Sequence, residues 1–569
     1  MFRSTVKVKL KHISCLLLLA LTVAPAVAQK KTSPDKRPNI ILIMADDMGY
    51  SDLGCYGGEI QTPNLDNLAK EGLRFNQFYN TSRCCPTRAA LMTGLYNHQA
   101  GIGNMNADQG VPGYRGFLTE NTVTLAEVLK SAGYQTGMVG KWHLSNTEEK
   151  KPKEEHLRWQ ANQVSYPLFS PLEQYPTSRG FDKYYGNMWG VVNFFDPFGL
   201  VNGNKPVPTV PKDYYYTDAL NDSASAYVRQ FSKKNEPFFL YVAHAAPHWP
   251  LHALPEDIAK YRDIYRAGWD EVRNERYKKM IKQGVFPKDK NILSPRWDKE
   301  RKWEDNPDKE WDIEAMAVRA AMVDRMDQGI GNIIKALKET GELDNTLIFF
   351  LSDNGSSSDN AQNYGPGYDR PGETRAGEKI IYPVNKEVLP GPENTFASHD
   401  KMWSNVANTP FRYWKTESYE GGLCTPMIAY WPQGLKAKKG SVTDQVGHVF
   451  DFMATFTELA GATYPAQYKG NKITPMAGKS LVPVLQGKQR QGHEYLFFEH
   501  IGRKAVRHGD WKLVALNNKP WELYNLKNDR TEVHNLAAKH PEMVDQLAAK
   551  WLEWAQQHNV LPKPQARNN

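Results

Sequence analysis

Asn39-Ile-Ile-Leu-Ile-Met-Ala45 is a continuous apolar run that ends directly at Asp46 and Asp47. An unbroken apolar run of this length is typical of a strand buried on both faces of a parallel sheet. Two further apolar runs also end at polar residues, 237–243 before His244 and His248 and 346–352 before Asp353 and Asn354, and another short predicted strand, 134–139, ends before Lys141 and His143. Ligands of open parallel sheets lie beyond the carboxyl ends of the strands, so we expect these polar side chains to form one site.

The segments between the strands predict helices, at about residues 62–72, 124–132, 218–231, 313–340 and 449–459. The fold class is therefore α/β, with a large mixed, mostly parallel sheet sandwiched by helices. From about residue 487 the pattern changes to short alternating strands at 494–499, 504–507, 511–516 and 522–525, with a closing helix at 541–558. We expect a catalytic domain over 37–486 and a smaller antiparallel sheet with a helix over 487–569.

Residues 1–28 have the pattern of a signal peptide. Arg3, Lys7, Lys9 and Lys11 form a basic start, residues 16–23 are apolar, and Ala26-Val27-Ala28 is a small-residue cleavage site. The apolar run is too short to span a bilayer. We therefore expect a periplasmic or secreted protein with no membrane span in the mature chain.

Charge and cysteine content exclude several classes of protein. The formal net charge is +8, and loss of the four basic residues of the signal segment lowers it to +4. This is too weak to indicate nucleic-acid binding, and no RNA-binding motif or basic arm is present. The four remaining cysteines, Cys55, Cys84, Cys85 and Cys424, are too few for a disulfide framework, and no C-x-x-C pair indicates zinc.

Asp46, Asp47, Asp353 and Asn354 all offer oxygen ligands and include no soft donor. That set suits a hard divalent cation, Ca²⁺ or Mg²⁺. Taken singly, Asp-Asp and Asp-Asn-Gly are also common in ordinary turns. Their occurrence at matching strand ends favours the metal site.

A second short segment, Cys84-Cys85-Pro86-Thr87-Arg88, predicts a loop that delivers a cysteine to the start of a helix closed by Gly94. Such a position favours an anion and a thiolate, although a pair of buried, packed cysteines is the alternative. Lys141, His143, His248 and Lys415 add cations and proton-transfer groups. Together with a metal they predict a pocket for a tetrahedral oxyanion, which a phosphate or a sulfate ester would fit.

The Cys84–Arg88 segment matches the C-x-P-x-R signature of the type I, formylglycine-dependent sulfatases. Gly140-Lys141-Trp142-His143-Leu144 matches their second signature. The chain thus resembles bacterial arylsulfatases of the alkaline-phosphatase-like superfamily, from about residue 38 through the C-terminal sheet.

This resemblance implies specific roles for the site residues. Cys84 would be oxidised to formylglycine by a formylglycine-generating or an anaerobic sulfatase-maturating enzyme, and its hydrated aldehyde would attack sulfur. Ca²⁺, with Mg²⁺ as the alternative, would be held by Asp46, Asp47, Cys84, Asp353 and Asn354. Arg88 would hold the modified residue, Lys141 and Lys415 would neutralise the sulfate, His248 would protonate the leaving alcohol, and His143 would assist sulfate release.

Two alternative functions remain: a phosphatase or phosphonate monoester hydrolase on the same scaffold, and a non-catalytic relative that binds sulfated glycans. The acids suffice for one metal ion, which favours a sulfatase over a two-metal phosphatase. The substrate would be a sulfated small molecule or glycan. Fifteen tryptophans and the irregular segment 355–407 favour a sugar-binding cleft, with His98, Asn104 and residues 189–198 as candidate specificity positions.

Overall fold

The computed structural model describes residues 1, 2, 4, 5, 37–147, 151–161, 169–286, 292–367 and 369–564. Lys36–Asn569 is a compact unit, and the fold below is that of this unit. Nearly all of the predicted signal peptide lies outside the described residues. Within them, no helix is long and apolar enough to cross a membrane.

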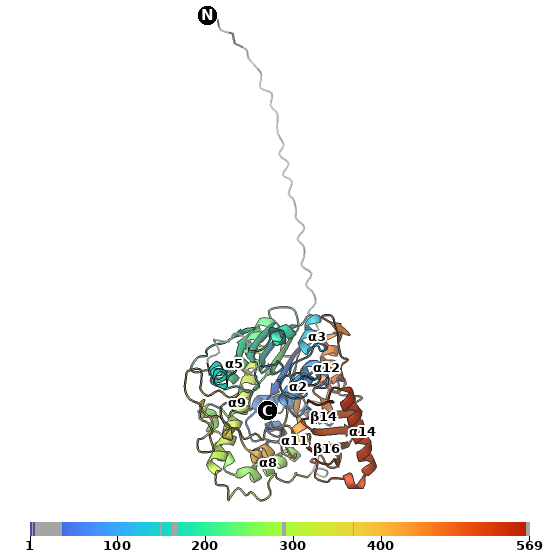
Figure 1. The fold of residues 1–569 in the computed structure, drawn as a ribbon. Helices are drawn as coiled ribbons and strands as arrows, with labels where there is room; N and C mark the ends of the chain where they lie inside the picture. Colours follow the sequence, from blue (N-terminus) through green and yellow to red (C-terminus); the bar gives the residue numbers. More distant parts are fainter. Residues whose placement is uncertain are drawn as a thin grey trace. The chain divides into compact units, whose positions relative to one another are not determined.

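A large mixed sheet forms the centre of the fold (Figure 1). Its middle consists of β8 (Thr346–Ser352), β1 (Asn39–Ala45), β7 (Phe238–Ala243) and β3 (Gln135–Gly140), in that order and all parallel. These strands correspond to the four that the sequence predicts at this edge, and every residue in them is buried. The predicted α/β fold with its mostly parallel centre is confirmed.

Shorter strands extend the sheet on both sides. Among the described residues the order is β10-β2-β9-β8-β1-β7-β3-β4-β5-β6, with β11 also paired to β2. The antiparallel members make the sheet mixed, because β9 runs against both β8 and β2, and β5 runs against both β4 and β6. The bounds are β2 Leu73–Tyr79, β4 Lys183–Asn187, β5 Leu200–Asn202, β6 Lys205–Pro206, β9 Cys424–Tyr430, β10 Ser441–Thr443 and β11 Gly447–His448.

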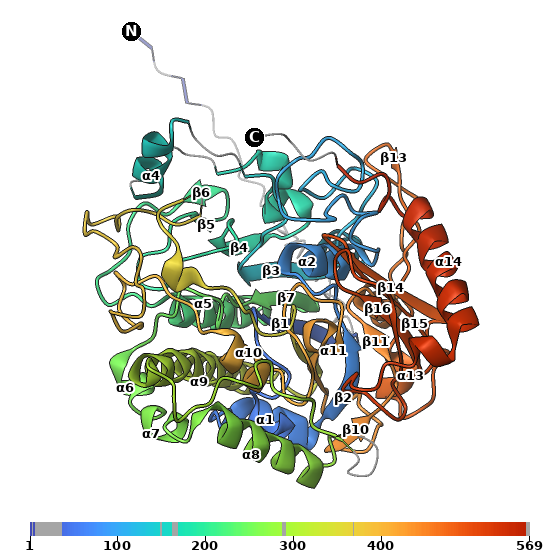
Figure 2. The same cartoon turned by 60° about the horizontal axis from the view of Figure 1, so that its bottom comes forward.

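Helices cover both faces of this sheet, and the alternation of side chains along β1 explains why. Ile41 and Ile43 pack into a core with α1 (Pro63–Glu71), α5 (Tyr216–Phe231) and α9 (Lys309–Glu339). Ile40 and Leu42 point the other way, into a core with α2 (Cys84–Thr93), α3 (Leu125–Ser131) and α12 (Asp451–Ala460). Figure 2 shows α5, α9 and α1 on one side of β1 and β7, and α2 on the other. Both faces of the central strands are therefore shielded from solvent.

The C-terminal part is a four-stranded antiparallel sheet, β14-β15-β16-β17 (Tyr495–His500, Arg503–His508, Trp511–Ala515 and Glu522–Asn525). The closing helix α14 (Pro541–Gln557) lies along this sheet (Figure 1). Trp554 of α14 stacks on Phe497 with ring centroids 5.1 Å apart. The predicted small sheet and closing helix are confirmed, while the domain boundary at 486/487 stays a prediction.

The charged stretch after β7 contains α8 (Gly268–Lys282). Its Arg276 is buried and pairs with Asp52 at 2.8 Å and Glu59 at 2.6 Å, which explains how a helix rich in charge packs against the core. The other elements are short: α4 Lys153–Ala161, α6 Pro255–Ile258, α7 Arg262–Tyr265, α10 Lys401–Ala407, α11 Glu420–Leu423, α13 Val482–Leu485, β12 Gln467–Tyr468 and β13 Asn471–Lys472.

Candidate active site

The four central strands end at one edge of the sheet, and the polar residue after each end is held by its neighbour. Asp353 donates its backbone N–H to Ala45 O at 3.1 Å, and His244 donates to Met44 O at 2.8 Å. Lys141 donates in the same way to Ala243 O at 2.8 Å. The hydrogen-bonded ladder thus continues one residue beyond the strands and fixes these side chains at the carboxyl edge.

Asp46 lies at the centre of this edge and faces two cations. Its Oδ2 accepts a short hydrogen bond from Lys141 Nζ and lies 3.7 Å from Arg88 Nη2. All three side chains are fully buried. Burial raises the pKa of Asp46 despite the neighbouring Lys141 and Arg88. Its other oxygen, Oδ1, is buried and has no hydrogen-bond partner among the described residues.

Arg88 connects α2 to the strand ends. Its Nε and Nη2 donate to Asp353 Oδ2 at 3.1 and 2.8 Å, and its Nη1 donates to Lys141 O at 3.0 Å. Burial, followed by the proximity of Asp46, raises the pKa of Asp353 to about 7. A buried acid with such a pKa binds a cation in exchange for its proton.

In the other half of the site, Asp47 contacts Asn354, Lys415 and His248. Its carboxylate accepts from Asn354 Nδ2 at 2.6 Å and from Lys415 Nζ at 2.8 Å, and lies 3.6 Å from His248 Nε2. Burial would raise the pKa of Asp47, but the charges of Lys415 and His248 outweigh it and hold the pKa below its usual value. Asn354 Oδ1, like Asp46 Oδ1, is buried without a partner among the described residues.

Cys84 is the first residue of α2, at the helix start that the sequence predicts, and Pro86 is the third residue of the helix. The hydrogen bond from the Cys85 thiol, together with the charge of Lys141, lowers the pKa of Cys84 well below its usual value. The ligand atoms of Cys84, Cys85 and His143 lie within 4.8 Å of one another. His143 has a positive φ of 56°, and burial lowers its pKa to about 3, which keeps the imidazole neutral.

The structure therefore brings the predicted catalytic and metal-binding residues into one buried region at the carboxyl edge. Cations and imidazoles surround three acids, and Asp46, Asp47 and His248 offer ligand atoms within 4.8 Å of one another. The residues also fit a cation, because two buried oxygens, Asp46 Oδ1 and Asn354 Oδ1, lack partners in the described chain and the acid and amide donors are hard oxygen atoms.

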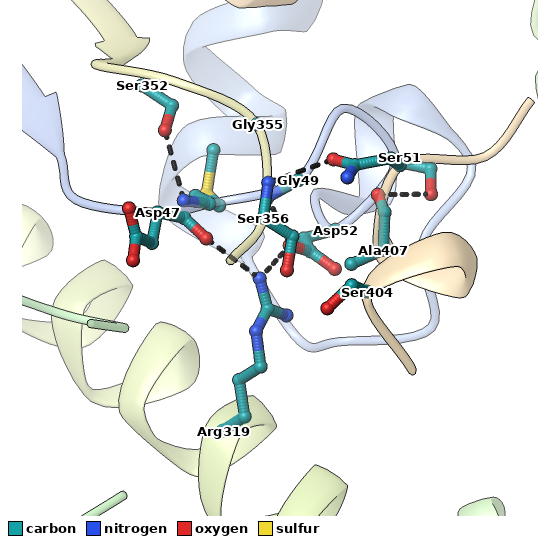
Figure 3. A network of polar contacts seen from close by, with 12 residues as sticks. Asp47, Gly49, Ser51, Asp52, Arg319, Ser352, Gly355, Ser356, Ser404 and Ala407 are labelled. Atoms are coloured by element: carbon teal, nitrogen blue, oxygen red, sulfur yellow. Dashed lines mark hydrogen bonds and ion pairs between the residues drawn. The ribbon is translucent and has the colours of Figure 1, made fainter. Parts of the chain in front are cut away.

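A network beneath Asp47 holds the loop after β1 in place (Figure 3). Arg319 of α9 donates to Asp47 O at 3.2 Å and to Asp52 Oδ2 at 2.6 Å. Ser352 Oγ accepts from the Met48 N–H at 3.0 Å. Asp47 itself has a φ of 63°, in the left-handed region, so these contacts stabilise a backbone conformation that costs energy. The sequence indicates Arg319 only as one charged residue in a long helix, and no local signal marks its role.

The sequence gives no signal for Asp359, which lies near the site, and two candidate specificity positions differ from expectation. Asp359 accepts from Trp249 Nε1 at 2.8 Å; burial would raise its pKa, but Lys415 and Arg83 lower it to about 2. His98, a candidate specificity position, is instead fully buried with Nε2 3.0 Å from Glu499 Oε2. Trp189, which begins the candidate segment 189–198, is also buried. Aromatic residues that line a cleft and those that fill a core have the same sequence pattern.

The profile of the sulfatase family matches residues 38–462, which include all of these site residues. The chain belongs to the sulfatase family. The profile of the N-sulphoglucosamine sulphohydrolase C-terminal region matches residues 411–557 of this sulfatase. Its family makes it an arylsulfatase-like enzyme whose general reaction is the hydrolysis of sulfate esters.

Individual relatives are similar to this sulfatase over most of their lengths. An uncharacterized sulfatase of Schizosaccharomyces pombe is 31% identical, over 95% of this sulfatase and 97% of that protein. An arylsulfatase of Klebsiella aerogenes is 32% identical, over 80% and 93%. Among solved structures, Ps i-CgsB in complex with k-i-k-neocarrahexaose has a TM-score of 0.63 and 25% identity, and covers 93% of this chain and 98% of that one.

Proposed function

We propose that this sulfatase removes sulfate from sulfated carbohydrates, with Cys84 converted to formylglycine and a divalent cation bound at the strand edge. One observation carries the proposal: Cys84 at the start of α2 lies within 4.8 Å of the neutral His143, and the charges of Lys141 and Lys415 lower its pKa. The ligand expected of such a pocket is a tetrahedral oxyanion. The sulfatase signature at Cys84 supports a sulfate ester as that oxyanion.

Asp46, Asp47, Asp353 and Asn354 would hold the cation, with Ca²⁺ expected and Mg²⁺ as the alternative, and position 84 would supply a further ligand. The cation would add Lewis-acid polarisation of the sulfate oxygens. Arg88 orients Asp353 through two hydrogen bonds and comes from the helix that carries Cys84. Metal ligands and position 84 are therefore held by one rigid set of contacts.

Conversion of Cys84 to formylglycine would supply a hydrated aldehyde, which can both attack sulfur and later expel sulfate, a step that a thiol cannot perform. The chain's own residues would manage charge and protons around it. Lys141 and Lys415 neutralise the sulfate oxygens, and neutral His143, with a pKa of about 3, accepts a proton from the hydroxyl at position 84.

His248 would deliver the proton to the leaving alcohol. Burial lowers its pKa to about 4, and its Nε2 lies 3.6 Å from Asp47 Oδ2. A sulfate ester bound beside it favours the imidazolium, because a nearby negative charge raises the pKa of histidine. Substrate binding would thereby favour the protonated form of His248 that acts as the general acid.

The carbohydrate preference is supported by a relative and by the expected location. Ps i-CgsB, at 25% identity, is described with a bound k-i-k-neocarrahexaose. A periplasmic or secreted enzyme, as residues 1–28 predict, would meet sulfated glycans outside the cytoplasm. Its maturation would require a formylglycine-generating or an anaerobic sulfatase-maturating enzyme as partner.

The proposal is tested with protein matured in the presence of such a partner enzyme. Sulfate release is measured on a panel of sulfated mono- and oligosaccharides, with p-nitrophenyl sulfate and p-nitrophenyl phosphate as matched aryl esters. We expect release from at least one saccharide, slow phosphate hydrolysis, a peptide mass at Cys84 that shows the aldehyde, and no activity in Cys84→Ala. Faster phosphate hydrolysis, or an unmodified thiol in active enzyme, would contradict it.

A further inference from the structure

A pocket of 450 Å³ lies outside the cluster of acids described above. Its volume is in the range of small-molecule sites, about 300–1,000 Å³. Three of its lining side chains are cationic and none is acidic. The lining residues are Pro295, Arg296, Trp297, Lys299, Asn405, Arg412, Tyr413 and Val533.

Trp297 gives this pocket an exposed aromatic surface. Its side chain is 44% exposed, and it is the one tryptophan among the large exposed hydrophobic residues of the described chain. The indole is nevertheless fixed, because its ring meets those of Trp414 and Tyr413 edge-on at 4.6 and 5.7 Å. The backbone N–H of Trp297 also donates to Asn405 Oδ1 at 3.1 Å, which holds the chain at this residue. A rigid, exposed indole is a surface on which the apolar face of a sugar ring can stack.

Positive charge surrounds this indole. Lys401 Nζ lies 5.7 Å from the centroid of the Trp297 ring, and the Lys299 ammonium makes no ion pair with a described residue, whereas Arg296 is paired with Asp270. The neighbouring Asp298 directs Oδ1 to the backbone N–H groups of Glu300 and Arg301, at 3.0 and 3.3 Å. The pocket therefore favours an anionic ligand over a neutral one.

One short segment joins the pocket to the active site. Tyr413 lines the pocket, and Lys415, which holds Asp47, is two residues further along. Their Cα atoms are thus within about 7.6 Å. The segment is braced, because Tyr413 O accepts from Asn408 Nδ2 at 3.2 Å and the Lys415 N–H donates to Ser356 O at 3.1 Å. The pocket wall and the active-site lysine form one rigid piece.

We propose that the Trp297 pocket binds a second, anionic residue of an oligosaccharide whose sulfate ester lies at Lys415. This inference rests on the proposed carbohydrate sulfatase function and extends it. The indole of Trp297 stacks on the sugar ring, and Lys299 and Lys401 attract its sulfate or carboxylate group. The enzyme then favours sulfated oligosaccharides over monosaccharides and aryl sulfates.

The test uses matured enzyme and the variants Trp297→Ala, Trp297→Phe and Lys299→Ala, with Lys519→Ala, an exposed lysine of the C-terminal sheet region, as the charge-matched control. The kcat/KM values are measured for p-nitrophenyl sulfate and for tetra- and hexasaccharides of sulfated galactan and of glycosaminoglycan. Calorimetry of the same oligosaccharides on Cys84→Ala protein measures binding without turnover.

We expect Trp297→Ala to lower the ratio of oligosaccharide to aryl kcat/KM about tenfold, mainly through KM, and to weaken binding by the same factor; this corresponds to about 1.4 kcal/mol. Trp297→Phe should restore most of the loss, and Lys519→Ala should match the wild type. An unchanged ratio, or no oligosaccharide binding at all, would overturn the inference. If aryl sulfate is turned over and Trp297→Ala has no effect, the inference about the pocket fails while the sulfatase assignment stands. Absence of all sulfate release by the matured wild-type enzyme refutes the proposed function itself.

Discussion

Arg88 holds Asp353 with two hydrogen bonds, of 3.1 and 2.8 Å to the same carboxylate oxygen, from a helix that begins at Cys84. Both side chains are fully buried. The contact fixes α2, and with it position 84, against the end of β8. An acid expected to bind metal and the residue expected to attack sulfur are thereby placed by one ion pair.

Arg88→Lys should abolish most activity. Lysine keeps the charge but cannot supply the forked pair of donors, so Asp353 and position 84 lose their common orientation. We expect kcat to fall by about 10²–10³. The control is Arg229→Lys, which changes an exposed ion pair with Glu339 and should leave kcat unchanged. Equal kcat in Arg88→Lys and wild type would show that the fork is not required.

Removal of divalent cations should inactivate and destabilise the enzyme. Asp46 Oδ1 and Asn354 Oδ1 are buried without partners in the described chain, so a bound cation would satisfy them and would stabilise the folded state. We expect chelation to abolish sulfate release and lower Tm, and Ca²⁺ to restore both more effectively than Mg²⁺. Asn354→Leu should weaken the Ca²⁺ dependence of Tm. Full activity in thoroughly chelated protein would contradict the metal site.

Much of this site could be predicted from the sequence because it follows strand ends. Asp46, Lys141 and Asp353 come at the ends of strands that the sequence predicts, and the carboxyl-edge rule then brings them together. Arg319 could not be found this way, since it contacts Asp47 across 272 residues of sequence. The exposure of Trp297 and the burial of Trp189 likewise depend on tertiary packing that no local pattern encodes.

Arg319→Met should lower both the stability and the activity of the enzyme. The substitution leaves Asp52 with one fewer buried cation and releases the Asp47 carbonyl. Loss of one partner from a buried ion pair costs about 3–5 kcal/mol, so Tm should fall clearly. Because Asp47 has a φ of 63°, its carboxylate should also shift and Ca²⁺ affinity should fall. Calorimetric Ca²⁺ binding at a temperature where the variant is folded checks this; unaltered affinity would assign Arg319 to stability alone.

Acid stability should depend on Glu499, where β14 meets His98. Burial would raise the pKa of Glu499, but the hydrogen bond and charge of His98, with Lys563, lower it from 4.5 to about 2. An acid with a lowered folded pKa stabilises the protein above its unfolded pKa, and this contribution is lost as the pH falls from 4.5 towards 2. Denaturant unfolding across this range should therefore show a gap between wild type and Glu499→Gln that closes on acidification. A gap independent of pH would refute the linkage.

Gly190→Ala should misplace His143 without unfolding the protein. A Cβ atom at position 190 would lie 2.4 Å from Cε1 and Nε2 of His143, closer than any van der Waals contact allows. The imidazole must therefore move, and a displacement of about 1 Å at a proton-transfer group costs about 10² in rate. We expect kcat to fall by that factor while Tm drops only slightly. The matched control is Gly492→Ala, because a Cβ at position 492 meets no described atom within 4 Å. If both alanine variants retain full kcat, His143 takes no part in the rate-limiting step, and its proposed role as proton acceptor at position 84 is wrong.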